Sequence, residues 1–124
     1  MATVLVIEDH EENLRILRDL LASARYQMLE AVTGEDGLSI AKARCPDVIL
    51  MDIQLPGLDG YEVTRRLKAD PALRHIPVIA VTSYALSGDD AKAFEAGCNA
   101  YVAKPYDPIA LLAKIREYVA PHGP

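Results

Sequence analysis

The sequence has no tryptophan, a single phenylalanine and only two cysteines. It also lacks any apolar run near the ~20 residues that a membrane-spanning helix needs, so we expect no membrane span. The first residues, MATVLVIEDH, carry no basic segment before their apolar run, which argues against a secretory signal peptide. Cys45 and Cys98 do not have metal-ligand spacing, and reduced thiols in a cytoplasmic protein are the expectation.

Positive charge is also scarce. Thirteen lysines and arginines stand against eighteen acidic residues, giving a formal net charge of −5. Binding to nucleic acid phosphates usually requires a basic patch, so we expect no direct contact with nucleic acid. The 124 residues, without repeats or low-complexity segments, suit one domain. We predict a single domain over 1–124, with a core from about 3 to 119 and a short tail at 120–124.

Two kinds of segment alternate along the chain. Apolar segments rich in β-branched residues predict strands at 3–8, 26–32, 47–52, 76–82 and 100–104. The remaining sequence predicts helices at 11–24, 35–44, 59–69, 87–96 and 107–119. Five strand–helix repeats predict an α/β fold with a parallel sheet between two helical layers. The more polar segment 26–32 is the expected edge strand, because interior strands of such sheets are continuously apolar.

Reactive side chains follow four of the five predicted strands. They are Glu8 and Asp9, Asp52, Thr82 and Ser83, and Lys104. Ligands of open parallel sheets bind beyond the carboxyl ends of the strands, so these side chains are expected to converge. Two carboxylates ~4 Å apart repel by about 4 kcal/mol at an effective dielectric of 20. Three carboxylates and one lysine therefore require either a protonated acid with a raised pKa or a bound cation.

A hard divalent ion with oxygen ligands, Mg²⁺, is the simplest such cation. It would attract a phosphate whose other oxygens could contact Lys104 and the Thr82 hydroxyl. Asp52 would then be a carboxylate nucleophile for phosphoryl transfer. The buried strand would hold Asp52 rigidly, and the Pro56–Gly57 turn would shape the pocket beside it.

Four motifs together resemble the receiver domain of bacterial two-component response regulators. They are the acidic pair after the first strand, DxxLPGxDG from Asp52, PVIAVTS at 77–83 and Lys104-Pro105. The resemblance covers nearly the whole chain and implies a (βα)5 doubly wound, flavodoxin-like three-layer sandwich with strand order 2-1-3-4-5. It implies a signalling module and not an enzyme in the ordinary sense. The start at Met1 and the short tail after Val119 favour a stand-alone protein without a DNA-binding output domain, and we expect a monomer or a weak dimer. Its phosphoryl donor would be a phosphohistidine of a sensor histidine kinase or a histidine phosphotransfer protein.

The resemblance also implies a role for each acidic residue. Asp52 would be the phosphoacceptor in an Mg²⁺-dependent reaction, with Mn²⁺ as a possible substitute. Asp9, Asp52 and the backbone carbonyl of Gln54 would bind the metal directly. Glu8, a glutamate where aspartate is more common, would bind it through water.

Other positions would hold the phosphoryl group. The resemblance implies that Thr82 and Lys104 contact it and that the small Ser83 leaves room for it. The Lys104–Pro105 peptide bond is expected to be cis, since cis bonds are plausible only before proline.

The signalling output would depend on aromatic residues. Tyr101 would be the conformational switch, changing the face formed by the fourth helix, fifth strand and fifth helix and so the binding of a downstream protein. A packed core aromatic is the alternative role for Tyr101. The bulky Tyr84 and Gln54 would line the route of the hydrolytic water, so Tyr84 would slow dephosphorylation. His10 is either a bystander or tunes metal or phosphate affinity.

Three other functions fit the sequence less well. A haloacid-dehalogenase-type phosphatase needs a second aspartate where Gln54 stands, and a flavin mononucleotide binder needs a Ser/Thr/Gly phosphate loop where residues 8–13 read EDHEEN. An inert, degenerate receiver is disfavoured because every expected reactive group is present. A receiver excised from a hybrid histidine kinase remains the main alternative.

Overall fold

The computed structural model describes residues 2–82 and 89–119. Five strands and five helices alternate within them. The strands are β1 (Thr3–Ile7), β2 (Gln27–Ala31), β3 (Val48–Asp52), β4 (Val78–Thr82) and β5 (Ala100–Ala103). The helices are α1 (Glu11–Ser23), α2 (Gly34–Arg44), α3 (Gly60–Ala69), α4 (Asp89–Ala96) and α5 (Pro108–Tyr118). Where both ends are described, the predicted bounds differ from the observed ones by at most two residues.

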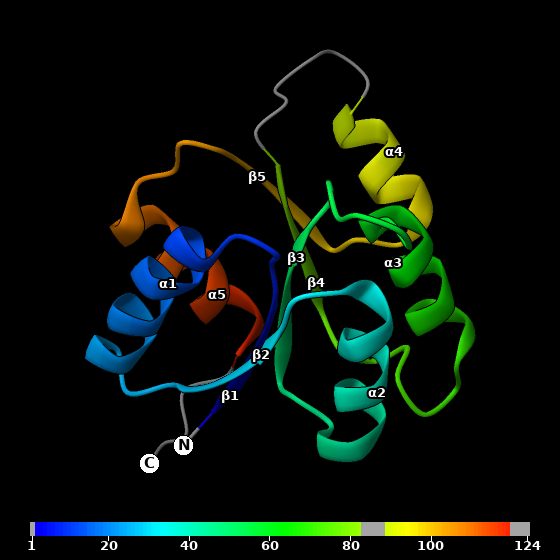
Figure 1. The fold of residues 1–124 in the computed structure, drawn as a ribbon, viewed down its shortest axis with the longest axis horizontal. Helices are drawn as coiled ribbons and strands as arrows, with labels where there is room; N and C mark the ends of the chain where they lie inside the picture. The colour runs from blue at the N-terminus through cyan, green and yellow to red at the C-terminus, as the bar shows by residue number, and fades with distance from the viewer. Residues whose placement is uncertain (1, 83–88, 120–124) are drawn as a thin grey trace.

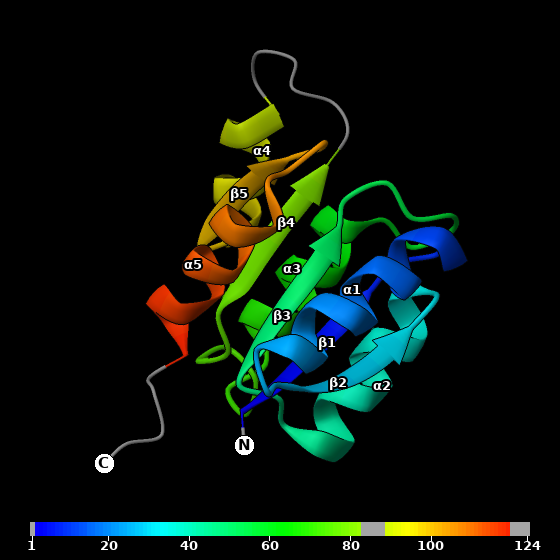
Figure 2. The same cartoon turned by 90° about the vertical axis from the view of Figure 1, so that its left-hand side faces the viewer.

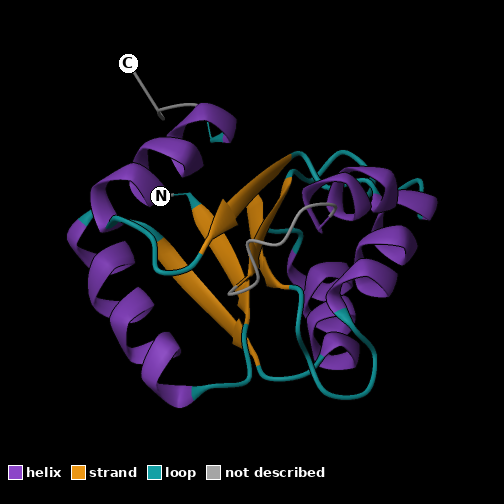
Figure 3. Cartoon of the chain, turned by 90° about the horizontal axis from the view of Figure 1, so that it is seen from above, coloured by secondary structure: helices purple, strands orange, loops and turns teal. Residues whose placement is uncertain are grey.

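All neighbouring strands pair in parallel, and their order is β2-β1-β3-β4-β5. Helices α1 and α5 cover one face of the sheet, and α2, α3 and α4 cover the other (Figures 1 and 3). The predicted doubly wound three-layer fold is therefore confirmed, with β2 as one edge. In Figure 2 the parallel direction of the strands brings their carboxyl ends to a single side of the molecule.

Two hydrophobic cores explain why the interior strands are continuously apolar. In β3, Ile49 and Met51 pack toward α2, α3 and α4, whereas Val48 and Leu50 pack toward α1 and α5. Every residue of β3 and of β4 is buried. Since successive side chains of a strand point to opposite faces, a strand buried on both sides has no polar positions to alternate with.

Capping side chains begin three helices close to the carboxyl ends of the strands. Thr33, Asp59 and Asp107 each accept a hydrogen bond from a backbone N–H in the first turn of α2, α3 and α5, respectively. Pro108 follows Asp107 in the first turn of α5, where a backbone N–H is not needed for the helix. Among the described residues, no helix combines the length and apolar character needed to cross a bilayer.

Candidate functional site

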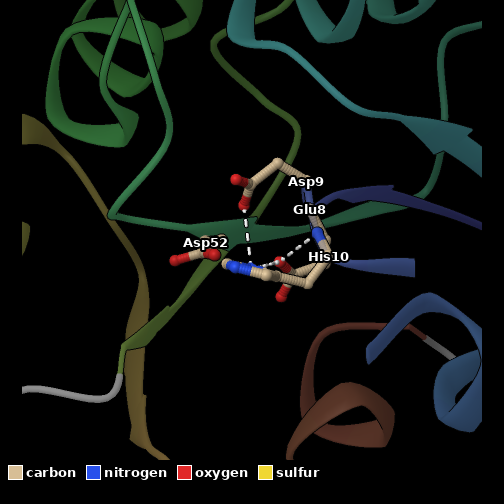
Figure 4. A group of neighbouring side chains, drawn as sticks. All are labelled: Glu8, Asp9, His10 and Asp52. Carbon is tan, nitrogen blue, oxygen red and sulfur yellow. Dashed lines mark hydrogen bonds and ion pairs between the residues drawn. The ribbon is translucent and has the colours of Figure 1, made fainter. Parts of the chain in front are cut away.

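Side chains from three strand ends meet at the carboxyl edge of the sheet. Glu8, Asp9 and His10 follow β1, and Asp52 ends β3; one ligand atom from each lies within 4.8 Å of the others (Figure 4). Lys104, which follows β5, places its Nζ 2.9 Å from Glu8 Oε1 and 3.8 Å from Asp52 Oδ2. For Glu8, Asp9, Asp52 and Lys104, the convergence expected from the sequence is therefore present in the fold.

Glu8 is charged although its residue surface is only 3% exposed. Its Oε1 accepts hydrogen bonds from Lys104 Nζ at 2.9 Å and from Asn13 Nδ2 at 3.1 Å, and its Oε2 accepts the backbone N–H of His10 at 3.1 Å. Burial alone would raise the pKa of Glu8. The hydrogen bonds and the charge of Lys104 outweigh burial and lower that pKa to about 2.

Asp52 has the opposite electrostatic character. It is 5% exposed, and its Oδ1 accepts the backbone N–H of Gln54 at 2.9 Å. Burial, reinforced by the negative charge of Glu8, raises the pKa of Asp52 to about 6, against the opposing effects of the Gln54 N–H and Lys104. One acid of the cluster thus has a raised pKa, as the charge count predicts, and it takes up a proton near pH 6. A bound cation would keep this carboxylate ionised.

Asp9 carries an oxygen suited to that cation. Its Oδ1 is shielded from solvent and accepts no hydrogen bond from any residue between 2 and 82 or 89 and 119. His10 Nδ1 lies 3.2 Å from this oxygen, but without hydrogen-bond geometry. A buried carboxylate oxygen without a donor is costly unless it has a positive partner. Together with the other carboxylates, it makes a donor set that fits Mg²⁺.

An open cavity of about 200 Å³ gives solvent and ligands access to the cluster. Its lining residues are His10, Glu12, Asn13, Asp52, Gln54 and Lys104. The volume is sufficient for a hydrated ion or a phosphoryl group, and Lys104 lies in its wall.

Some of the other predicted site residues lie in the described part of the chain, and two of them do not. Thr82 is 2% exposed at the end of β4, and its carbonyl oxygen accepts the backbone N–H of Lys104 at 2.7 Å, which ties these two strand ends together. The Lys104–Pro105 peptide bond is cis, the isomer that the resemblance implies. Tyr101 is half-buried on β5 and packs against the core beneath α2, α3 and α4. Ser83 and Tyr84 lie outside the described residues.

Two residues at the site were not predicted from the sequence. They are Asn13, which contacts Glu8, and Tyr106, which lies nearby. Asn13 donates to Glu8, and its place in the first turn of a helix that starts just after the acidic pair could have revealed it. Tyr106 lines a small pocket with Glu8 and Asp52, and burial and the charge of Glu8 raise the pKa of its hydroxyl. No sequence pattern distinguishes Tyr106 from an ordinary loop tyrosine.

Gly60 allows α3 to begin directly against the backbone of Asp52. A Cβ at this position would lie 2.7 Å from the Asp52 carbonyl oxygen and 2.7 Å from Ile53 Cα, so the backbone would have to move. We expect Gly60→Ala to lower the free energy of unfolding by about 1–3 kcal/mol. Urea denaturation measures this loss, and the backbone amide shifts of Asp52 and Ile53 should change with it.

Gly57→Ala is the matched control for this substitution. Gly57 has a φ of +72°, and a Cβ there would meet nothing within 4 Å. This variant should therefore cost only about 1 kcal/mol from backbone strain and leave the Asp52 amide shift in place. Equal shifts at Asp52 in the two variants would contradict the role given to Gly60.

A family model and the sequences of known proteins indicate the same family for this chain. Residues 4–116 match the family model described as the response regulator receiver domain. The polar-differentiation response regulator DivK of Brucella ovis is 43% identical over 117 residues, which are 94% of this chain and 95% of the relative.

Solved structures are similar over the same length. The receiver domain of a sensor histidine kinase from Pseudomonas aeruginosa PAO1, with a magnesium ion coordinated in its active-site cleft, has a TM-score of 0.88 and 34% identity, covering 94% of this chain and 96% of that one. A CheY-like receiver domain protein from Methanospirillum hungatei JF-1 has a TM-score of 0.87 and 28% identity, covering 94% and 92%.

Proposed function

Because this chain belongs to the response regulator receiver family, we propose that it is a phosphorylation-controlled signalling module with Asp52 as its phosphoacceptor. The family is a two-component signalling module and not a classical enzyme class. We propose a phosphohistidine of a sensor kinase or a histidine phosphotransfer protein as the donor. The observation that carries the proposal is the position of Asp52, buried at a strand end and 3.8 Å from Lys104 within a cluster of acids.

The acidic cluster fits a divalent metal. Asp9, Asp52 and the carbonyl of Gln54 would hold Mg²⁺ or Mn²⁺, with Glu8 acting through water. Asp9 Oδ1, which accepts no hydrogen bond from the described part of the chain, supports this choice, as does the magnesium ion in the cleft of the Pseudomonas aeruginosa receiver. When bound, the ion supplies positive charge that offsets the charge of the carboxylates and of the phosphoryl oxygens.

The side chains of this chain prepare Asp52 for attack. The Gln54 N–H holds Oδ1, which leaves Oδ2, on the Lys104 side, to attack phosphorus. An O–P bond forms while the P–N bond to the donor imidazole breaks, and the electron pair stays on nitrogen. The Lys104 ammonium and the Thr82 hydroxyl would contact the oxygens of the transferred group and stabilise their charge.

The switch would start from Thr82. A phosphoryl group on Asp52 would draw the Thr82 hydroxyl inward, with the small Ser83 leaving room, and Tyr101 would occupy the space released. The surface formed by α4, β5 and α5 would then change its affinity for a downstream protein. Reversing a 99:1 population requires about 5.5 kcal/mol, which contacts of a new dianion with the metal, Lys104 and Thr82 could supply.

Direct phosphorylation tests this function. Incubating the protein with acetyl phosphate and Mg²⁺ should add one phosphoryl group, observed by intact mass spectrometry. Hydroxylamine should remove it, because it cleaves acyl phosphates, and the tryptic peptide 45–65 should carry it. Chelating the metal should stop the reaction. Failure to incorporate phosphate from acetyl phosphate or a phosphorylated histidine phosphotransfer domain, or incorporation on another peptide, would refute the proposal.

A further inference from the structure

His10 lies against the acidic cluster, where its ring Nδ1 hydrogen-bonds with Glu8 Oε2. Its Nδ1 is 3.2 Å from Asp9 Oδ1 and 3.3 Å from Glu8 Oε2, although 68% of its side chain is exposed. Figure 4 shows its ring turned toward these carboxylates. His10 occupies the N-cap position of α1, yet its side chain makes no capping hydrogen bond. Thr33, Asp59 and Asp107 make such bonds at the other caps described above.

The spacing of these atoms matches ligands that share one ion. Metal–ligand distances of about 2.0–2.2 Å place neighbouring ligand atoms about 3.0–3.5 Å apart in octahedral or tetrahedral geometry. The distances from His10 Nδ1 to the Asp9 and Glu8 oxygens fall in this range. Moreover, Asp9 Oδ1 is buried and close to Nδ1 without hydrogen-bonding to it. A cation bound by both atoms would give Asp9 Oδ1 a positive partner and would replace the hydrogen bond of His10 Nδ1 to Glu8.

Building on the proposed metal-dependent function, we propose that His10 is a nitrogen ligand of this site and extends its metal range from Mg²⁺ and Mn²⁺ to Co²⁺ and Zn²⁺. His10 Nδ1 and Asp9 Oδ1 form the N,O pair that binds these ions. Mg²⁺ prefers oxygen ligands, whereas imidazole suits the borderline transition metals, whose affinities rise from Mn²⁺ to Co²⁺ in the Irving–Williams order.

Glu8 is less available than His10 as a direct metal ligand. Lys104 and Asn13 donate to its Oε1, and the His10 backbone N–H donates to its Oε2, so Glu8 keeps three donors when the His10 ring leaves its hydrogen bond to Oε2. The exposed imidazole can rotate onto an ion without disturbing the core. The site therefore offers one nitrogen and the oxygens of Asp9 and Asp52, a donor set that discriminates in favour of transition metals.

The test compares the full-length wild-type protein with His10→Gln and with His75→Gln. His75 is exposed and precedes β4, at the opposite end of the sheet from the cluster, so it controls for a general loss of imidazole. Titration calorimetry with Zn²⁺ and Co²⁺, and Mn²⁺ electron paramagnetic resonance with Mg²⁺ competition, give the affinities. Electron spin-echo modulation of bound Mn²⁺ reports directly on a coordinated nitrogen.

We expect nitrogen modulation in the wild type and in His75→Gln, and its loss in His10→Gln. The affinity for Zn²⁺ and Co²⁺ should fall tenfold or more in His10→Gln, while the affinity for Mg²⁺ changes less than about threefold. Thermal unfolding without metal should be similar in all three proteins, because contacts of a mostly exposed side chain with charged groups contribute little to stability.

Three results would overturn the inference. One is the absence of nitrogen modulation in the wild type; another is an equal loss of Mg²⁺ and Zn²⁺ affinity in His10→Gln; the third is an equal loss of Zn²⁺ affinity in His75→Gln. Normal Mg²⁺ binding in these cases would leave the proposed function standing. A wild-type protein that binds no divalent ion would overturn both.

Discussion

Asp52→Asn is expected to abolish phosphoryl incorporation and, at the same time, to stabilise the folded chain at neutral pH. The amide has no carboxylate to attack phosphorus, so intact mass spectrometry should detect no phosphorylated protein. The gain in stability has a separate cause. Burial and the charge of Glu8 raise the pKa of Asp52 from 3.8 to about 6, so its ionised form destabilises the fold. Asparagine removes that charge with little change of shape.

The sign and pH range of the effect follow from this pKa. The folded state holds the proton more tightly than the unfolded state, so stability falls as pH rises from about 4 to about 6. The shift corresponds to about 3 kcal/mol at most, and we expect Asp52→Asn to recover about 1–3 kcal/mol of unfolding free energy above pH 6. The difference should disappear below about pH 4, where Asp52 is protonated in both states.

Urea denaturation across this pH range, without metal, measures the prediction. Asp19→Asn is the matched control, because Asp19 is exposed on α1 and its replacement should change stability little at any pH. Adding Mg²⁺ should stabilise the wild type more than Asp52→Asn, because a ligand that binds only the folded state stabilises it by mass action. A less stable Asp52→Asn at neutral pH would contradict the electrostatic account of this site.

The architecture was predictable because two independent patterns agree. Continuously apolar segments such as VILM of β3 indicate strands buried on both faces, and the intervening helical periods require crossovers. Ends of elements were less certain. The strand predicted from 76 starts at Val78, because the preceding Pro77 has no N–H for the ladder.

The site was predictable only where chain order determines position. A residue directly after a strand, such as Glu8 or Lys104, must lie at the carboxyl edge of a parallel sheet. Asn13 reaches the site through the orientation of the first turn of α1, which no strand-end rule reveals. Side-chain geometry also determines that the Lys104 ammonium lies closer to Glu8 than to Asp52. Sequence therefore identified the reactive groups, and the fold was needed to show how their charges are paired.

Lys104→Met is expected to lower both the rate of phosphorylation and the stability of the fold. The ammonium lies 3.8 Å from Asp52 Oδ2, where it would stabilise charge on the transferred group, and its loss should slow incorporation by about 100- to 1,000-fold. The same ammonium donates to the buried Glu8 at 2.9 Å. Removing one partner of a buried ion pair leaves the other charge uncompensated, which should cost about 2–4 kcal/mol at neutral pH. Phosphorylation time courses with quenched samples measure the rate, and urea denaturation measures the stability.

The pH dependence distinguishes this loss from a simple packing defect. In the wild type the pKa of Glu8 is lowered to about 2, so its contribution is complete above pH 4.5 and is lost as pH falls toward 2. Without Lys104, burial should raise that pKa, and the deficit of Lys104→Met should shrink steadily below about pH 5. Lys104→Arg, which keeps the charge but not the compact ammonium, should retain stability better than transfer rate. A deficit that is unchanged between about pH 7 and pH 3 would show that methionine disturbs packing and not the charge balance, and the electrostatic coupling of Lys104 to Glu8 would then be wrong.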